Sequence, residues 1–261
     1  MLVSDEYFNN VLAPKYFLSN KMVALKVTNM CPVACDHCRE NASMDNIGIV
    51  SKEVIDNIID QIKNDGWVLC LQGGEPLILP ETCEYIINKC NENGIATNLY
   101  TSGFWYKHCD VLIPEILKWN PTIVCVSVND WTVAKLGGLE YVNTIARYFE
   151  KDDTPILLYS EVNLDGPKYK ELVDIKTCTI SYELAPVGRA KNLIGTYKAA
   201  GKMERWMGRD MCVLSGFEIG VDGTIYPNCC AAAGSSCRFG NIKNVELKSL
   251  LKMRKKFCDG F

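Results

Sequence analysis

The chain has 261 residues, of which 48% are apolar and 23% are charged, a composition typical of globular proteins. Its formal net charge of −3 gives no basic field of the kind that attracts nucleic acids. No apolar stretch is long enough to cross a membrane, and residues 1–10 lack the basic and apolar regions of a signal peptide. We therefore expect a cytoplasmic protein that binds neither nucleic acid nor a membrane.

Short β-type runs alternate with helical runs from about Met22 to Leu184. Six β/α units in series favour a parallel sheet with right-handed crossovers. Because a closed barrel of this type needs eight strands, the expected fold class is α/β, a partial (β/α)6 barrel of the TIM type that is open on one side. The predicted strands are residues 23–29, 67–72, 95–101, 122–128, 156–163 and 177–184, and the predicted helices are 51–66 (with Ser51 as N-cap), 81–94, 109–120 and 139–149.

The character of the sequence changes after Ala185. Asp222-Gly223 lies between two alternating runs and predicts a β-hairpin, and a last helix is expected at residues 245–257. This part has too little apolar sequence for a core of its own, so cross-linking by a metal cluster would explain how it folds. The expected organisation is an N-terminal segment (1–21), a barrel (22–190) and a C-terminal extension (191–261).

Fourteen cysteines indicate metal or redox chemistry, because disulfides are rare in a reducing compartment. With only two histidines, the chain has little scope for histidine-centred zinc or acid–base chemistry. The cysteines form a first group of Cys31, Cys35 and Cys38, a second group of Cys212, Cys229, Cys230, Cys237 and Cys258, and six scattered residues expected as buried hydrophobes, namely Cys70, Cys83, Cys90, Cys109, Cys125 and Cys178.

The first group has the spacing C-x3-C-x2-C, which lets three thiolates from one loop bind three corners of an iron–sulfur cube. Closed electron-transfer clusters have four cysteine ligands, so three ligands indicate an open iron. A structural zinc ion is the alternative, but it needs a fourth ligand and more commonly uses pairs of C-x2-C. An iron–sulfur cluster is therefore favoured.

This spacing resembles the cluster loop of the radical S-adenosylmethionine (SAM) enzymes, in which the amino and carboxylate groups of SAM chelate the open iron of a [4Fe-4S] cluster. Gly73-Gly74-Glu75-Pro76 follows the second predicted strand, as a similar motif does in that family, where it holds the SAM amino group. Two glycines let a backbone approach a ligand closely, and Glu75 offers an acceptor for an ammonium group. The resemblance implies a SAM site at this end of the sheet.

Further residues take positions that similar enzymes use for SAM. Thr101 and Ser102 on the third strand, and Ser127 with Asn129 or Asp130 on the fourth, match positions for the SAM carboxylate and ribose. His37 stands where the family has an aromatic residue beside the adenine, and Arg189 recurs after the sixth strand of related peptide-modifying enzymes. Taken singly, each strand-end residue is also compatible with a capped strand end, and Arg189 with a surface salt bridge.

The second cysteine group resembles the SPASM and twitch extensions, which carry auxiliary iron–sulfur clusters. The chain lacks the C-x2-C-x5-C-x3-C run of that family, so we expect a single auxiliary cluster, of [4Fe-4S] type. Its expected ligands are Cys212, Cys229, Cys237 and Cys258, with Cys230 as an alternative to Cys229. Adjacent side chains of an extended segment point to opposite faces, so one thiol of the Cys229-Cys230 pair stays free.

Thr101 to Trp105, PVGRAK and IYPNCC together resemble the radical SAM peptide epimerases that act on ribosomal peptides. The resemblance implies a peptide substrate, a flavodoxin, ferredoxin or reductase as electron donor, and Cys230 as the catalytic hydrogen-atom donor. Three alternatives stay open. They are an oxidative enzyme that forms thioether or carbon–carbon crosslinks or dehydrogenates a small molecule, a non-catalytic iron–sulfur electron carrier, and a zinc-binding structural protein.

Overall fold

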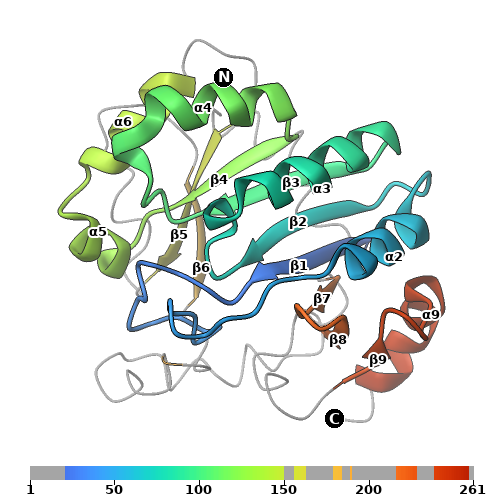
Figure 1. The fold of residues 1–261 in the computed structure, drawn as a ribbon. Coiled ribbons are helices and arrows are strands. Elements are labelled where there is room, and N and C mark those ends of the chain that lie inside the picture. The colour runs from blue at the N-terminus through green and yellow to red at the C-terminus, as the bar shows by residue number, and fades with distance from the viewer. Residues whose placement is uncertain are drawn as a thin grey trace.

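The computed structural model describes residues 21–149, 156–162, 179–183, 189, 216–227 and 238–258. Within these ranges the chain forms one nine-stranded sheet in the order β6-β5-β4-β3-β2-β1-β7-β8-β9 (Figure 1). The first six strands are all parallel and follow one another in chain order, which confirms the predicted α/β partial-barrel fold. They are β1 (Met22–Thr28), β2 (Val68–Gly73), β3 (Ala96–Thr101), β4 (Ile123–Ser127), β5 (Ile156–Val162) and β6 (Thr179–Glu183).

The crossover helices lie along one face of this sheet, as Figure 1 shows. Ser51 caps the first of them, as expected, by accepting a hydrogen bond from the N–H of Val54 at 3.3 Å. That helix ends at Ile62, four residues before the predicted end at Gly66, because the backbone leaves the helical region at Lys63 (ψ 146°). The helices are α2 (Lys52–Ile62), α3 (Pro80–Glu92), α4 (Cys109–Trp119), α5 (Asp130–Leu136) and α6 (Glu140–Phe149), with short 3₁₀ turns η2 (Pro76–Ile78) and η3 (Tyr106–His108).

The alternation along β1 shows how the sheet divides its two faces. Val23, Leu25 and Val27 are fully buried in the main core, together with apolar side chains of α2. Lys26 and Thr28 alternate with them and therefore lie on the opposite, inner face of the sheet. The carboxyl ends of the strands, where ligands bind in parallel α/β sheets, lead into the cluster loop and the Gly73–Pro76 motif.

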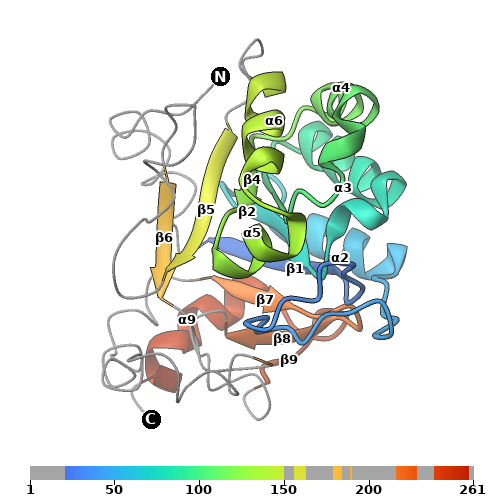
Figure 2. The ribbon, with the colours of Figure 1, turned by 90° about the vertical axis from the view of Figure 1, so that its left-hand side faces the viewer.

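The described part of the C-terminal extension continues the same sheet. β7 (Phe217–Ile219) pairs in parallel with β1, and β8 (Thr224–Pro227) pairs antiparallel with β7, which confirms the predicted hairpin. Gly223 adopts a left-handed φ of +83° in the connecting turn. The hairpin is followed by β9 (Gly240–Asn241) and helix α9 (Leu247–Cys258), which confirms the last predicted helix (Figure 2).

This extension does not depend on a core of its own, because its side chains enter the core of the barrel. Phe217, Ile219, Ile225 and Leu247 are fully buried within the cluster formed by β1 and the crossover helices. Gln61 of α2 also binds the extension: its Oε1 accepts from the N–H that opens α9, at 2.9 Å. The division into a barrel and an extension at about residue 190 stays a prediction.

None of the helices in the described ranges is long and apolar enough to cross a membrane. The scattered cysteines behave as expected wherever they are described. Burial raises the pKa of Cys70 and of Cys90 to about 12, so both thiols keep their protons at neutral pH. Cys83, Cys109 and Cys125 are buried as well, and Cys178 lies outside the described residues.

Candidate active site

The cluster loop, residues 31–42, leaves the carboxyl end of β1 and folds back on itself. Cys31 and Cys35 are buried, with Val33 and Ala42, in a small apolar cluster that Cys38 also contacts. The N–H of Ala42 donates to Sγ of Cys38 at 3.4 Å. The three thiols therefore lie on one compact and largely buried loop.

The chemistry of this loop fits an iron–sulfur cluster. The pKa of the Cys31 thiol lies above its usual value because burial disfavours the thiolate, although backbone N–H groups of Ala34 and Val33 partly offset that effect. Iron supplies the opposite charge that a buried thiolate needs. In the described part of the chain, no three His, Cys, Asp or Glu side chains are placed to hold a single metal ion. In a cube each cysteine binds a different iron, so its ligands need not converge on one point.

The Gly73–Pro76 motif lies directly against the chain that enters the cluster loop. The N–H of Gly74 donates to the carbonyl of Thr28 at 2.6 Å, and the N–H of Glu75 donates to the carbonyl of Met30 at 2.7 Å. A Cβ on Gly74 would lie 1.9 Å from the Met30 oxygen. Glycine is therefore required at this position, because it lets the motif support the residue that precedes Cys31.

The carboxylate of Glu75 is fully buried and joins the carboxyl ends of β2 and β3. Its Oε1 accepts from the hydroxyl of Thr101 (2.8 Å) and the N–H of Leu77 (3.2 Å). Its Oε2 accepts from both the N–H and the hydroxyl of Ser102, at 2.7 and 2.6 Å. Burial raises the pKa of Glu75, and these four donors oppose the rise by stabilising the carboxylate. Thr101 and Ser102 thus contact Glu75, whose lone pairs are all engaged.

His37 connects the cluster loop to the end of β4. Its ring stacks on Trp131 with centroids 4.2 Å apart, and its Nε2 lies 3.4 Å from Nδ2 of Asn129. Oδ1 of Asn129 accepts from the N–H groups of Trp131 and Thr132 at the start of α5. The amide nitrogen must therefore face His37 as a donor, which makes Nε2 the acceptor and puts the ring proton of neutral His37 on Nδ1.

Arg189 binds the cluster loop at four points. Its Nε donates to the carbonyl of Cys35 (2.9 Å), its Nη2 to the carbonyl of Ala42 (2.7 Å) and its Nη1 to Oδ1 of Asn41 (3.4 Å). Its backbone N–H donates to the carbonyl of Cys38 at 2.9 Å. All four of these partners are neutral, so Arg189 forms no salt bridge with the residues that the structure describes.

Four charged side chains join the cluster loop to β1 and the hairpin. Lys26 lies 2.9 Å from Oε1 of Glu218 and also binds Glu40. Arg39 donates to Glu40 at 2.8 Å and pairs with Glu218. Burial alone would lower the pKa of Lys26, but the two carboxylates outweigh it and raise that pKa, so the lysine stays charged. Within the described ranges, these four side chains contribute two positive and two negative charges.

The structure brings most of the predicted residues that it describes into one connected site, with a few exceptions. Ser127 ends β4, where its carbonyl accepts from Tyr141 at 2.7 Å, and Pro76 begins η2. Cys258 is the last residue of α9, but its side chain is not described. The remaining predicted residues of the second group, Cys212, Cys229, Cys230 and Cys237, lie outside the described residues.

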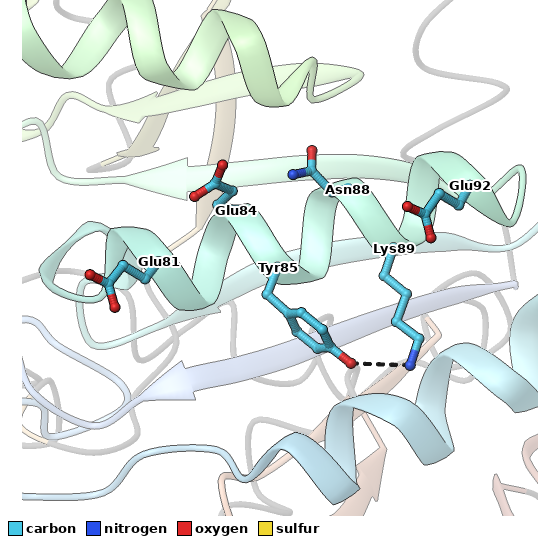
Figure 3. A pocket seen from close by; sticks show the side chains of 6 residues that line it. All are labelled: Glu81, Glu84, Tyr85, Asn88, Lys89 and Glu92. Carbon is cyan, nitrogen blue, oxygen red and sulfur yellow. Dashed lines mark hydrogen bonds between the residues drawn. The ribbon is translucent and has the colours of Figure 1, made fainter.

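A surface hollow on α3 is separate from this site. It is lined by Glu81, Glu84, Tyr85, Asn88, Lys89 and Glu92, which Figure 3 shows along the outer side of the helix. The hydroxyl of Tyr85 lies 3.1 Å from Nζ of Lys89. None of the lining residues belongs to the cluster loop or to the Gly73–Pro76 motif.

Sequence reasoning missed two contributors to the site. Trp131 follows Asn129 in a helix, α5, that was not predicted, so its stacking on His37 had no local signal. The ionic network did have such a signal, because Lys26 is the one charged residue of β1. Such a charge needs buried partners, but nothing in the sequence identifies Glu40 and Glu218 as those partners.

Comparison with known proteins finds one family model that matches part of the chain. Residues 25–150 match the model of the Radical SAM superfamily. No curated protein sequence matches the chain. Members of the radical SAM family use a [4Fe-4S] cluster and SAM, which is the donor chemistry that the cluster loop fits.

Solved structures with low sequence identity share the fold. Streptococcus suis SuiB bound to S-adenosylmethionine has a TM-score of 0.63 at 13% identity, covering 97% of this chain and 71% of SuiB. SuiB bound to its precursor peptide SuiA scores 0.62 at 12% identity, covering 94% and 67%. For anSMEcpe with AdoMet and the Cp18Cys peptide, the TM-score is 0.56 at 18% identity, covering 90% of this chain and 82% of anSMEcpe. For BtrN with AdoMet and 2-DOIA, the TM-score is 0.52 at 13% identity, covering 92% of this chain and 89% of BtrN. The family match covers residues 25–150, and these solved structures share the fold of the chain.

Proposed function

We propose that this chain is a radical SAM enzyme that modifies a ribosomally made peptide. The observation that carries the proposal is the contact between the cluster loop and the Gly73–Pro76 motif, which brings the predicted cluster ligands to the predicted SAM site. Cys31, Cys35 and Cys38 would hold a [4Fe-4S] cluster. When bound, the cluster and SAM together supply a 5′-deoxyadenosyl radical that removes a hydrogen atom from the substrate.

The residues of the chain would bind SAM and position it. The SAM amino group would lie against the Gly73–Pro76 motif, whose backbone is held beside the chain that enters the cluster loop. Thr101 and Ser102 would lie near the SAM carboxylate, and Ser127 and Asn129 near the ribose.

Other residues would support this site from behind. Glu75 would keep the ends of β2 and β3 together, and His37 and Trp131 would form an aromatic wall for the adenine. The inner face of the sheet would exclude water from the reacting atoms.

Peptide substrates are supported by the fold neighbours, since SuiB and anSMEcpe are each seen with a peptide. We propose L-to-D epimerisation as the reaction. An L-residue would lose its α-hydrogen, and the S–H of Cys230 would return a hydrogen atom from the opposite face. The resulting thiyl radical would be restored to a thiol by one electron from a flavodoxin, ferredoxin or reductase and one proton from solvent. The auxiliary cluster of Cys212, Cys229, Cys237 and Cys258 would lie on that electron route.

The enzyme class is tested with anaerobically reconstituted full-length protein, SAM and a chemical reductant. We expect an iron-loaded protein that forms 5′-deoxyadenosine, and a Cys35→Ala variant that contains less iron, by the content of one cluster, and forms no 5′-deoxyadenosine. Cys90→Ala is the matched control, because it also removes a buried thiol but lies on α3. A wild-type protein that binds iron without forming 5′-deoxyadenosine would favour the electron-carrier alternative, and a zinc-loaded protein would favour the structural one.

Epimerisation is tested in D₂O with a peptide encoded beside the gene. A thiol exchanges its proton with solvent, so the product D-residue should gain deuterium at its α-carbon. Cys230→Ala should abolish this incorporation while 5′-deoxyadenosine still forms. A crosslinked or dehydrogenated product, with yield unaffected in Cys230→Ala, would support the oxidative alternative. That alternative is favoured by the fold shared with BtrN, a structure that holds a small molecule.

A further inference from the structure

We propose that Arg189 is a positioning residue of the cluster loop, and that its charge stabilises the reduced state of the cluster. The inference rests on the proposed function, because it requires Cys31, Cys35 and Cys38 to hold that cluster. It assigns Arg189 to the protein framework of the cluster instead of to the SAM ligands expected from the sequence.

The first argument is the geometry of the guanidinium group. The planar guanidinium group donates hydrogen bonds to the carbonyl of Cys35 (2.9 Å), the carbonyl of Ala42 (2.7 Å) and Oδ1 of Asn41 (3.4 Å). The backbone N–H of the same residue binds the carbonyl of Cys38 at 2.9 Å. Two of the three cysteines are thus fixed through their own backbones by one residue that lies about 150 positions away along the chain.

The second argument is the balance of charge around the loop. Among the residues that the structure describes, the positive groups of Lys26 and Arg39 pair with the carboxylates of Glu40 and Glu218, so these four charges balance one another. Every hydrogen-bond partner that the structure gives Arg189 is a neutral oxygen. Its full positive charge therefore acts on the loop without a neighbouring carboxylate among these partners.

A cluster gains a negative charge when it is reduced. A nearby cation stabilises that additional charge, which raises the reduction potential, and the net charge around a cluster is one of the main determinants of its potential. The same cation facilitates the delivery of the electron that starts the reaction. Arg189 would therefore have two roles: it would fix the cluster loop in place, and it would favour reduction of the cluster.

The test compares the full-length reconstituted protein with Arg189→Gln and Arg189→Lys. Iron content, the rate of iron release to a chelator and a redox titration followed by electron paramagnetic resonance are measured for each. The signal of the SAM-bound cluster is identified by its change on adding SAM. Arg147→Gln, which removes an exposed arginine on α6, is the control for the loss of one positive charge.

Gln removes the charge, so we expect the ratio of reduced to oxidised cluster at a fixed potential to fall about tenfold, which is about 59 mV for one electron. Lys keeps the charge but cannot span three acceptors, so its potential should stay near that of the wild type while its iron is released faster. If Arg189→Gln does not retain a cluster, the reduction potential of the Arg189→Lys cluster decides the charge effect. A potential near that of the wild type supports the proposal. A tenfold fall in the ratio of reduced to oxidised cluster at a fixed potential overturns it.

The proposal is overturned if Arg189→Gln retains iron and has the potential of the wild type and of Arg147→Gln. This outcome differs from a failure of the proposed function. In that case the wild-type protein itself would assemble no SAM-responsive cluster, and no comparison among the variants would arise.

Discussion

Ser102 donates two hydrogen bonds to the same oxygen of Glu75, one from its backbone N–H at 2.7 Å and one from its hydroxyl at 2.6 Å. This pair fixes the carboxyl end of β3 to the turn after β2. A buried carboxylate without a cation partner is costly, and its hydrogen bonds are what make it tolerable here. The residue expected from the sequence as a ligand for an ammonium group is thus also a structural link between two strands.

Glu75→Gln should destabilise the protein, because the amide nitrogen would face the donors of Ser102 or Thr101 instead of accepting from them. A buried donor left without an acceptor costs about 1–3 kcal/mol, which chemical denaturation would measure. Glu84→Gln is the control, since Glu84 is exposed on α3. Equal stability of the two variants would mean that the four hydrogen bonds of Glu75 do not support the fold.

Gly74→Ala should disturb the cluster loop, since the added Cβ would lie 1.9 Å from the carbonyl oxygen of Met30 and must displace the chain before Cys31. We expect reduced iron content after reconstitution. Gly94→Ala is the control: it has open space around its Cβ but a left-handed φ of +65°, so it costs about 1–2 kcal/mol of strain without affecting iron. Full iron loading of Gly74→Ala would show that the loop tolerates this displacement.

Lys26 and Glu218 should show a strong coupling in a double-mutant cycle. Lys26→Met or Glu218→Gln alone leaves the largely buried network with an unmatched charge, at a cost of about 1–3 kcal/mol after allowing for its partial exposure. The double variant restores the balance, so its destabilisation should be smaller than the sum by about 0.5–3 kcal/mol. Additive single effects, measured by urea unfolding, would mean that the two residues act independently.

Asp222 should stabilise the hairpin in a pH-dependent way. Burial alone would raise its pKa, but hydrogen bonds from the N–H (3.0 Å) and hydroxyl (2.8 Å) of Thr224 outweigh burial and lower the pKa from 3.8. A carboxyl with a lower pKa in the folded state binds fewer protons there, so its contribution is present above the unfolded value and is lost as the pH falls through the folded one.

The side chain of Asp222 is exposed, so we expect its contribution to be under about 1 kcal/mol. The stability difference between the wild type and Asp222→Asn should therefore be largest near neutral pH and shrink below about pH 4. A difference that is constant with pH in urea unfolding would contradict this assignment.

Much of the fold was predictable because its signals are local. All six parallel strands were expected within about two residues of their observed bounds, since each is a short β-type run in the sequence. The end of α2 was placed wrongly at Gly66, because Lys63 and Asn64 carry no stronger stop signal than their neighbours. The parallel pairing of β7 with β1 was not expected, because no local pattern encodes contacts between segments so far apart.

The candidate site also has features that the sequence predicts and features that it does not. Motifs encoded within a few residues, such as Cys31 to Cys38 and Gly73 to Pro76, identified the domain from the sequence. The partners of these motifs depend on the folded chain: the carbonyls bound by Arg189 and the carboxylate bound by Ser102 follow no spacing rule. Sequence reasoning therefore finds the groups that do chemistry more readily than the groups that hold them in place.

The position of β7 beside β1 has a consequence for how the chain folds during synthesis. The first strand of the sheet, β1 (Met22–Thr28), has one of its edges covered by Phe217–Ile219, which a ribosome makes almost two hundred residues later. Until then β1 presents an uncovered backbone edge next to an incomplete core. Nascent or truncated chains that end before Phe217 should therefore need chaperone protection, and aggregation of such fragments would arise from this edge.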